Sequence, residues 1–270
     1  MIPKADIVAW RQAAPWVSDA QVEQDLIISR ALVVIFRDTS IAEQLAFRGG
    51  TALHKLYFNP ARRYSEDIDL VQIAPRPIGE ILDALRDVLT VFLGKPRRVQ
   101  KKRSVTLIYR VDSEGPPVVP LRLKIEINTR EHFAVMGLFK RPFSVRSRWF
   151  TGEGAITTFA LEELLATKVR ALYQRRKGRD LFDLWYGLTE GRADALKIVE
   201  LFKAYMKAEG HVVKGADYLK NIEAKIMHPG FINDVTPLLP ADIDYDVKAA
   251  LSHITKEIVF PMDQTYKPEE

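Results

Sequence analysis

Two carboxylates in the stretch YSEDIDL, residues 64–70, have a spacing that suits chemistry at the surface of a sheet. Asp67 and Asp69 stand two residues apart, and an apolar residue follows each of them. Successive side chains of a strand point to opposite faces, so a strand here places both aspartates on one face and the apolar residues in the core. The stretch Leu121–Asn128 alternates in the same way and puts Glu126 on its polar face, beside the aspartates if the two strands are neighbours.

Three carboxylates that converge without counter-charge repel one another, and their pKa values rise. A divalent cation removes that cost, and oxygen ligands beside an open cleft suit Mg²⁺, or Mn²⁺, completed by substrate phosphates. Such ions can hold the attacking and leaving oxygens of an in-line phosphoryl displacement. We therefore expect Asp67, Asp69 and Glu126 to be metal ligands. The alternative is an exposed strand that carries solvated acids.

A pair of glycines lies upstream of the aspartates, between a short apolar run and a segment of helical character. Gly49 and Gly50 let backbone N–H groups approach an anion closely, and the start of a helix favours negative charge. Thr51 adds a hydroxyl that can donate to a phosphate. We expect a phosphate-binding turn; the alternative is a tight turn in which Thr51 is the N-cap of the helix.

The elements that position these residues form a mixed α/β part followed by a helical part. Periodicity predicts helices over Asp19–Phe36, Thr51–Phe58 and Pro77–Leu93, and strands over Ser65–Ile73, Val105–Val111 and Leu121–Asn128. From Ala160 onward nearly every segment is helix-periodic, beginning with Leu161–Arg176 and Asp180–Leu188. The predicted fold class is α+β, with a mixed-sheet lobe over residues 1–155 and an all-helical lobe over 156–270. Gly152–Gly154 is the expected hinge, and the tail at 266–270 is expected to be loose.

The first predicted helix of the helical lobe has a lysine in the middle of its apolar stripe. At 100° per residue, Lys168 lies among the leucines of Leu161–Arg176. A lysine in that place either extends its ammonium into water or reaches a buried anion. We expect the second, with a triphosphate as the anion. Asp180 follows the helix break at Gly178, where an aspartate also has a structural use at a helix start worth about 1 kcal/mol.

The charge of the chain favours a polyanionic partner. Its 270 residues carry a net charge of +5 and a sequence pI of about 9.2, with basic clusters at 95–103, 140–148 and 170–179. Each phosphate that a protein neutralises releases condensed counterions, so such clusters suit RNA. The alternative is a solvated basic surface.

Composition also limits the class of protein. The chain has no cysteine, which excludes disulfides and thiolate chemistry. It has no apolar run approaching the roughly 20 residues that span a bilayer, and its start lacks the order of a signal peptide. We expect a cytoplasmic protein without a membrane partner.

Three segments together resemble a known family: FRGGTALHKLY, RYSEDIDL and KVRALYQRRKGRDLFDLW, all within residues 45–190. They resemble the AbiEii/AbiGii-type toxins of the polymerase-beta-like nucleotidyltransferase superfamily. That superfamily pairs a glycine-rich turn with a downstream D-x-D and a third acid on a later strand. The resemblance implies a nucleotidyltransferase-like mixed β-sheet lobe with flanking helices, followed by an all-helical C-terminal lobe.

The resemblance also implies roles for individual residues. It makes Asp67 and Asp69, with Glu126, the metal set, and Lys168 and Asp180 active-site residues of the second block. Arg176 and Arg179 are further candidates for orienting phosphate. The phosphates of an NTP substrate are assigned to Gly49, Gly50, Thr51, Ser65 and Lys168.

The activity that the resemblance implies is transfer of a nucleoside monophosphate from an NTP to an acceptor hydroxyl. MenT-type members of the family add nucleotides to the 3′ end of tRNA and so stop translation, which implies a toxin with a separately encoded antitoxin. One alternative is transfer to a protein or small-molecule hydroxyl. Another is a non-catalytic RNA-binding module, although carboxylates in an RNA groove weaken binding unless they carry metal.

Overall fold

The computed structural model describes residues 2–263, which form two compact units. The first contains Ile2–Phe159 together with Leu239–Ala241, and the second contains Ala160–Leu238 and Asp242–Asp263. The hinge predicted at Gly152–Gly154 is wrong, because these residues lie inside a strand that pairs with its neighbour. The tail at 266–270 lies outside the described residues.

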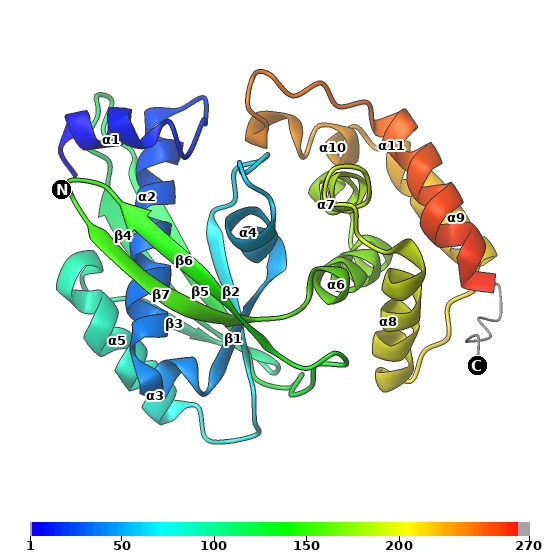
Figure 1. Ribbon diagram of the computed structural model, residues 1–270, viewed down its shortest axis with the longest axis horizontal. Coiled ribbons are helices and arrows are strands. Elements are labelled where there is room, and N and C mark those ends of the chain that lie inside the picture. Colours follow the sequence, from blue (N-terminus) through cyan, green and yellow to red (C-terminus); the bar gives the residue numbers. More distant parts are fainter. Residues whose placement is uncertain (1, 264–270) are drawn as a thin grey trace. The chain divides into compact units, whose positions relative to one another are not determined.

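The first unit is built on a seven-stranded mixed sheet with the order β3-β4-β5-β2-β1-β7-β6 (Figure 1). β2 pairs antiparallel with β1 and parallel with β5, so it lies in the middle of the sheet. The strands are β1 (Leu45–Arg48), β2 (Asp67–Gln72), β3 (Arg97–Gln100), β4 (Ser104–Asp112), β5 (Pro120–Asn128), β6 (Phe139–Arg146) and β7 (Thr151–Thr158).

Helices cover the apolar face of this sheet. α2 packs against β5, β6 and β7, and α5 packs against β4 and α2, as Figure 1 shows for the blue and cyan helices. α2 begins as predicted, with Ser18 and Gln21 forming a reciprocal capping box. The helices of this unit are α1 (Lys4–Trp10), α2 (Asp19–Arg37), α3 (Thr39–Ala42), α4 (Gly49–Ala52), the π-helical η1 (Leu53–Tyr57) and α5 (Gly79–Leu93).

The second unit is helical, as predicted. α6 (Leu161–Gln174) packs against α7 (Gly178–Thr189) and α8 (Ala195–Ala208), and α7 also packs against α11 (Val247–Ile254). The remaining elements are α9 (Gly215–Ile226), α10 (Pro229–Ile232), η2 (Thr236–Leu238), η3 (Thr255–Val259) and η4 (Phe260–Asp263). Within residues 2–263, no helix combines the length and hydropathy that crossing a bilayer requires.

Candidate active site

Two neighbouring strands bring the predicted carboxylates to one face of the sheet. β2 and β5 run parallel, with Asp69 opposite Glu126 and Asp67 opposite Lys124. Ile68 is fully buried on the other face, against the helices. The prediction that the two strands are neighbours is therefore confirmed, and Glu126 lies directly beside Asp69.

A lysine that the sequence analysis gave no role lies between two of these acids. The Lys124 Nζ is 3.3 Å from Asp67 Oδ2 and 3.1 Å from Glu126 Oε2. The three side chains are 27–35 % exposed, so solvent and ligands can reach them. The signal was present in the sequence, because Lys124 falls on the same strand face as Glu126.

One ammonium does not neutralise this cluster. Burial would raise the pKa of Glu126, but the hydrogen bond and the charge of Lys124 bring that pKa below its ordinary value. Burial raises the pKa of Asp67, and the attraction of Lys124 does not offset it. Burial would lower the pKa of Lys124, but the two carboxylates raise it. Asp67 and Glu126 thus share one lysine, and this pair keeps one more negative charge than the ammonium offsets.

The glycine turn lies directly against the second aspartate. Gly49 has φ +81°, and a Cβ at this position would collide with the carboxylate of Asp69. Only glycine combines that backbone conformation with so close an approach. α4 begins at Gly49 with Arg48 at the N-cap, so the alternative of Thr51 as N-cap is wrong.

The hydroxyls of Thr51 and Ser65 connect this turn to β2. Thr51 is 1 % exposed, and its Oγ1 lies 2.7 Å from the Ser65 Oγ and donates to the carbonyl of Asp67. These two contacts fix the position of the glycine turn relative to β2. The sequence-predicted residues of the first unit, from Gly49 to Glu126, are thus gathered at one place.

The residues of this cluster fit a divalent cation by charge and donor type. The described residues contain no ready-made group of three or more carboxylate, histidine or cysteine side chains in metal-binding geometry. Instead, the Lys124 ammonium occupies the place of a cation between Asp67 and Glu126. Oxygen donors, surplus negative charge and partial exposure are the properties that Mg²⁺ requires of a protein site.

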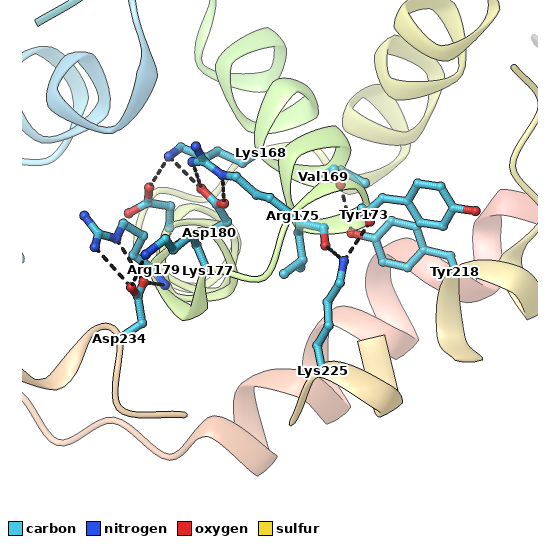
Figure 2. Close-up of polar contacts among 12 residues, drawn as sticks. Lys168, Val169, Tyr173, Arg175, Lys177, Arg179, Asp180, Tyr218, Lys225 and Asp234 are labelled. Atoms are coloured by element: carbon cyan, nitrogen blue, oxygen red, sulfur yellow. Dashed lines mark hydrogen bonds and ion pairs between the residues drawn. The ribbon is translucent and has the colours of Figure 1, made fainter. Parts of the chain in front are cut away.

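The second group of predicted residues forms a buried ion-pair network inside the helical unit (Figure 2). Lys168 Nζ lies 3.0 Å from Asp180 Oδ1 and 2.9 Å from Asp183 Oδ2. Arg175 adds two bonds to Asp180, from Nε at 2.7 Å and from Nη2 at 2.9 Å. Lys168 in the apolar stripe of α6 therefore does reach buried anions, and these are two aspartates of α7.

The aspartate of this network is strongly held as an anion. Burial would raise the pKa of Asp180, but the charge of Lys168 and the bonds from Arg175 bring it below its ordinary value. Asp180 lies in the first turn of α7, as predicted, and its side chain contacts these cations. Asp183 was missed, although its spacing three residues after Asp180 on a predicted helix places it on the same face.

A separate pair fixes the start of α7. Arg179 donates to Asp234 through Nε at 2.9 Å and through Nη2 at 3.1 Å, and Lys177 adds a contact at 3.3 Å (Figure 2). These bonds and the two charges lower the pKa of Asp234 to about 2, against the effect of burial. The Arg179 guanidinium is therefore engaged with its own unit, which weighs against a role in orienting phosphate.

Comparison with known families decides the class of protein. Residues 30–253 match the model of the AbiEii family, described as "Nucleotidyl transferase AbiEii toxin, Type IV TA system". The chain belongs to the AbiEii nucleotidyltransferase toxin family. Among curated proteins, none matches the sequence.

Solved structures share the fold of this AbiEii chain. MenT4, a nucleotidyltransferase toxin of Mycobacterium tuberculosis H37Rv, superposes with a TM-score of 0.63 at 15 % identity, over 98 % of this chain and 91 % of that one. A protein of H. pylori classed as a nucleotidyltransferase gives 0.56 at 17 % identity, over 92 % and 98 %. The α+β prediction, with its mixed sheet, flanking helices and helical C-terminal part, is confirmed.

Proposed function

We propose that this AbiEii toxin is a Mg²⁺-dependent, or Mn²⁺-dependent, enzyme that transfers NMP from an NTP to RNA, at the 3′ end of tRNA, and so blocks translation. It works in the cytoplasm, and a separately encoded antitoxin neutralises it. The observation that carries the proposal is the convergence of Asp67, Asp69 and Glu126 on one exposed sheet face, with Gly49 packed against Asp69.

In this proposal the first unit positions the reacting groups. Asp67 and Asp69, with Glu126, hold the divalent cation. When bound, that cation supplies charge neutralisation at the α-phosphate and at the leaving pyrophosphate. The turn at Gly49 and Gly50 receives the NTP phosphates, together with the hydroxyl of Ser65. Thr51 is buried and donates its hydroxyl to the carbonyl of Asp67, so its role is to hold the turn in place. Catalysis then consists mostly of positioning and charge neutralisation, as in other phosphoryl transfers.

Residues of the helical unit complete the assignment. Lys168 contacts the NTP phosphates, and Asp180 holds its ammonium in position. The 3.0 Å contact between Lys168 Nζ and Asp180 Oδ1 supports the positioning role of Asp180. Thermal melting tests it: NTP with Mg²⁺ raises the melting temperature of the parent protein and does so much less in Lys168→Ala. Equal shifts in both proteins would remove Lys168 from the nucleotide site.

An RNA acceptor is favoured by the basic character of the first unit. Both edge strands carry lysine or arginine, with Arg97 on β3 and Lys140 and Arg141 on β6. Transfer to a protein or small-molecule hydroxyl needs no such surface. A non-catalytic RNA-binding module would need no convergent carboxylates, which repel RNA phosphates.

A labelling experiment separates these functions. The purified protein is incubated with each α-labelled NTP, Mg²⁺, total RNA and total protein, and the label is then followed. We expect label in RNA of tRNA size. Label in protein would show that the acceptor is a protein hydroxyl and not RNA. RNA binding without transfer to any acceptor would identify a non-catalytic RNA-binding module.

The matched control for this experiment is Asp69→Ala. The variant removes one predicted metal ligand on a half-exposed strand face, so the fold persists while transfer and growth inhibition are lost. Circular dichroism checks the fold at equal expression. Undiminished growth inhibition by the variant would refute the mechanism.

A further inference from the structure

A basic pocket lies on the first unit, and none of its lining residues belongs to the metal and phosphate sites assigned above. It has a volume of about 320 Å³ and is lined by Lys95, Arg97, Ile108, Arg110 and Arg122. Four of the five lining residues are cations, and none is an acid. Within residues 2–263, none of these four cations is engaged in an ion pair. The chemistry of the pocket is therefore that of an anion site.

The strand register places this pocket on the same sheet face as the carboxylates. Arg97 pairs with Ile108, Ile108 with Lys124, and Lys124 with Asp67, so these residues form one row across four strands. At about 4.8 Å per strand, the row spans about 14 Å from Arg97 to Asp67. That length corresponds to about four nucleotides of a stacked strand, at roughly 3.4 Å each.

Two arginines of the pocket repel each other, and a bound anion would remove this repulsion. Arg110 on β4 and Arg122 on β5 are directly opposed in the antiparallel register. Like charges in that position destabilise a sheet. Basic residues on edge strands are common because they prevent edge-to-edge pairing, but β4 and β5 are inner strands. Edge protection explains Arg97 on β3 and leaves Arg110 and Arg122 unexplained.

The pocket is rigidly connected to the aspartate strand. The side chain of Gln24, buried on α2, donates to the carbonyl of Arg122 at 3.0 Å and to the carbonyl of Glu66 at 3.3 Å. One side chain thus fixes the backbone of the pocket and the residue that precedes Asp67. A ligand in the pocket is held in a defined position relative to the carboxylates.

The pocket and the glycine turn flank the aspartates from opposite sides. β2 has β1 on one side, which leads into Gly49, and β5, β4 and β3 on the other, which carry the pocket. In-line transfer requires the acceptor and the leaving pyrophosphate to lie on opposite sides of the reacting phosphorus. With the NTP phosphates on the glycine side, the acceptor approaches from the side of the pocket.

We propose that the pocket of Lys95, Arg97, Arg110 and Arg122 binds backbone phosphates of the acceptor RNA strand and directs its terminal hydroxyl to the aspartates. This assignment rests on the proposed function, since it takes the acceptor to be RNA. Ile108, 8 % exposed, gives the pocket an apolar floor for a ribose. The pocket reads phosphate and not base identity, so its contribution to binding is independent of sequence.

The test compares arginines on the two faces of one strand. Arg97→Gln removes a pocket charge, and Arg98→Gln removes the same charge from the adjacent, opposite-facing residue of β3, which is also exposed. Arg122→Gln is the second pocket variant. Binding of a fluorescein-labelled 20-nucleotide RNA is measured by anisotropy between 50 and 300 mM KCl.

We expect each pocket variant to weaken RNA binding about threefold to tenfold and to reduce the slope of log K against log[salt] by about 0.7. Arg98→Gln retains the slope of the parent. Equal effects of all three substitutions, or no effect of any, would overturn the proposal. Circular dichroism confirms that the variants are folded.

Two further measurements show whether the pocket binds RNA or the NTP, and whether a negative result refutes the pocket assignment alone or the proposed function as well. If the pocket variants lose the thermal stabilisation by ATP with Mg²⁺ and keep the RNA slope, the pocket holds the nucleotide and the proposal is wrong. Label transfer by the parent protein is measured first, because its absence refutes the proposed function by itself. If the parent labels RNA and the pocket variants keep its KM for RNA, the pocket assignment alone fails.

Discussion

Replacement of Lys168 by methionine tests whether the buried network is primarily structural. The change keeps the length of the side chain and removes the ammonium that contacts Asp180 and Asp183, both 0 % exposed. Removing one partner of a buried ion pair costs about 3–5 kcal/mol because a charge remains buried. Arg175 still contacts Asp180, so we expect the lower end, about 3 kcal/mol. At about 2–4 °C per kcal/mol, the melting temperature falls by about 6–12 °C.

The dependence of this loss on pH has a defined sign. In the parent protein the pKa of Asp180 is lowered, so its stabilising effect is present above its unfolded pKa and is lost as the pH falls through the folded value. In Lys168→Met, burial is no longer offset by the lysine, and the pKa of Asp180 rises. Protonation then relieves the buried charge, so the stability difference between parent and variant narrows as the pH falls from 7 to 4.

Urea denaturation at pH 7, 5.5 and 4 measures these differences. The double variant Lys168→Met with Asp183→Asn removes one charge of each sign and should recover stability to within about 1 kcal/mol of the parent. Recovery of stability without nucleotide transfer would assign Lys168 to the reaction, and recovery of both would make it structural. Full stability of the single variant, or additive losses in the double variant, would refute the reasoning.

Two further predictions concern single contacts. Gly49→Ala should abolish transfer, because its Cβ collides with Asp69, whereas Gly210→Ala, with φ +79° and open space around it, should lose only about 1 kcal/mol in urea denaturation and keep full transfer. Loss of transfer in both variants would contradict the close-contact argument. Burial against the C-terminal end of α6 lowers the pKa of Lys225 from 10.5 to about 8. The folded state therefore loses this proton first, and the free energy of unfolding rises with pH from about 8 to 10.5. Lys225→Met should remove that rise, and an identical rise in the variant would show that another group causes it.

The sequence predicted the elements that carry strong periodicity and missed those dominated by charge. The long helix from Asp19 and the strands at 105 and 121 were predicted within two residues of their observed limits. The sequence indicates only basic clusters at β3 and β6. β3 is four residues long with one apolar side chain, and in β6 Arg141 interrupts the apolar face of Phe139, Phe143 and Val145.

Residues of the candidate site could be predicted where a charged side chain lies beside like charges or among apolar residues. Two acids on one strand face and a lysine in an apolar stripe each demand a partner, and the sequence therefore pointed to Asp67, Asp69 and Lys168. Lys124 and Asp183 share a face with Glu126 and Asp180 in the sequence pattern, but only the pairing of β5 with β2 and the packing of α7 on α6 bring them to their partners. The periodicity of one segment gives the face on which a residue lies, and it does not give which distant strand or helix that face meets.

Both units use the same arrangement, one lysine between two acids, and burial gives the two copies different properties. Around Lys168 the acids are 0 % exposed and the lysine 6 %, so exchanging its ammonium for another cation means desolvating that cation completely. Around Lys124 the side chains are 27–35 % exposed, and the attraction at about 3 Å is weakened by solvent. Under the proposed function, a hydrated divalent ion displaces the ammonium there, keeps waters of its own and brings two positive charges in place of one. The proposed exchange of cations therefore belongs to the β2–β5 face, whereas the aspartates of α7 retain Lys168 as their cation.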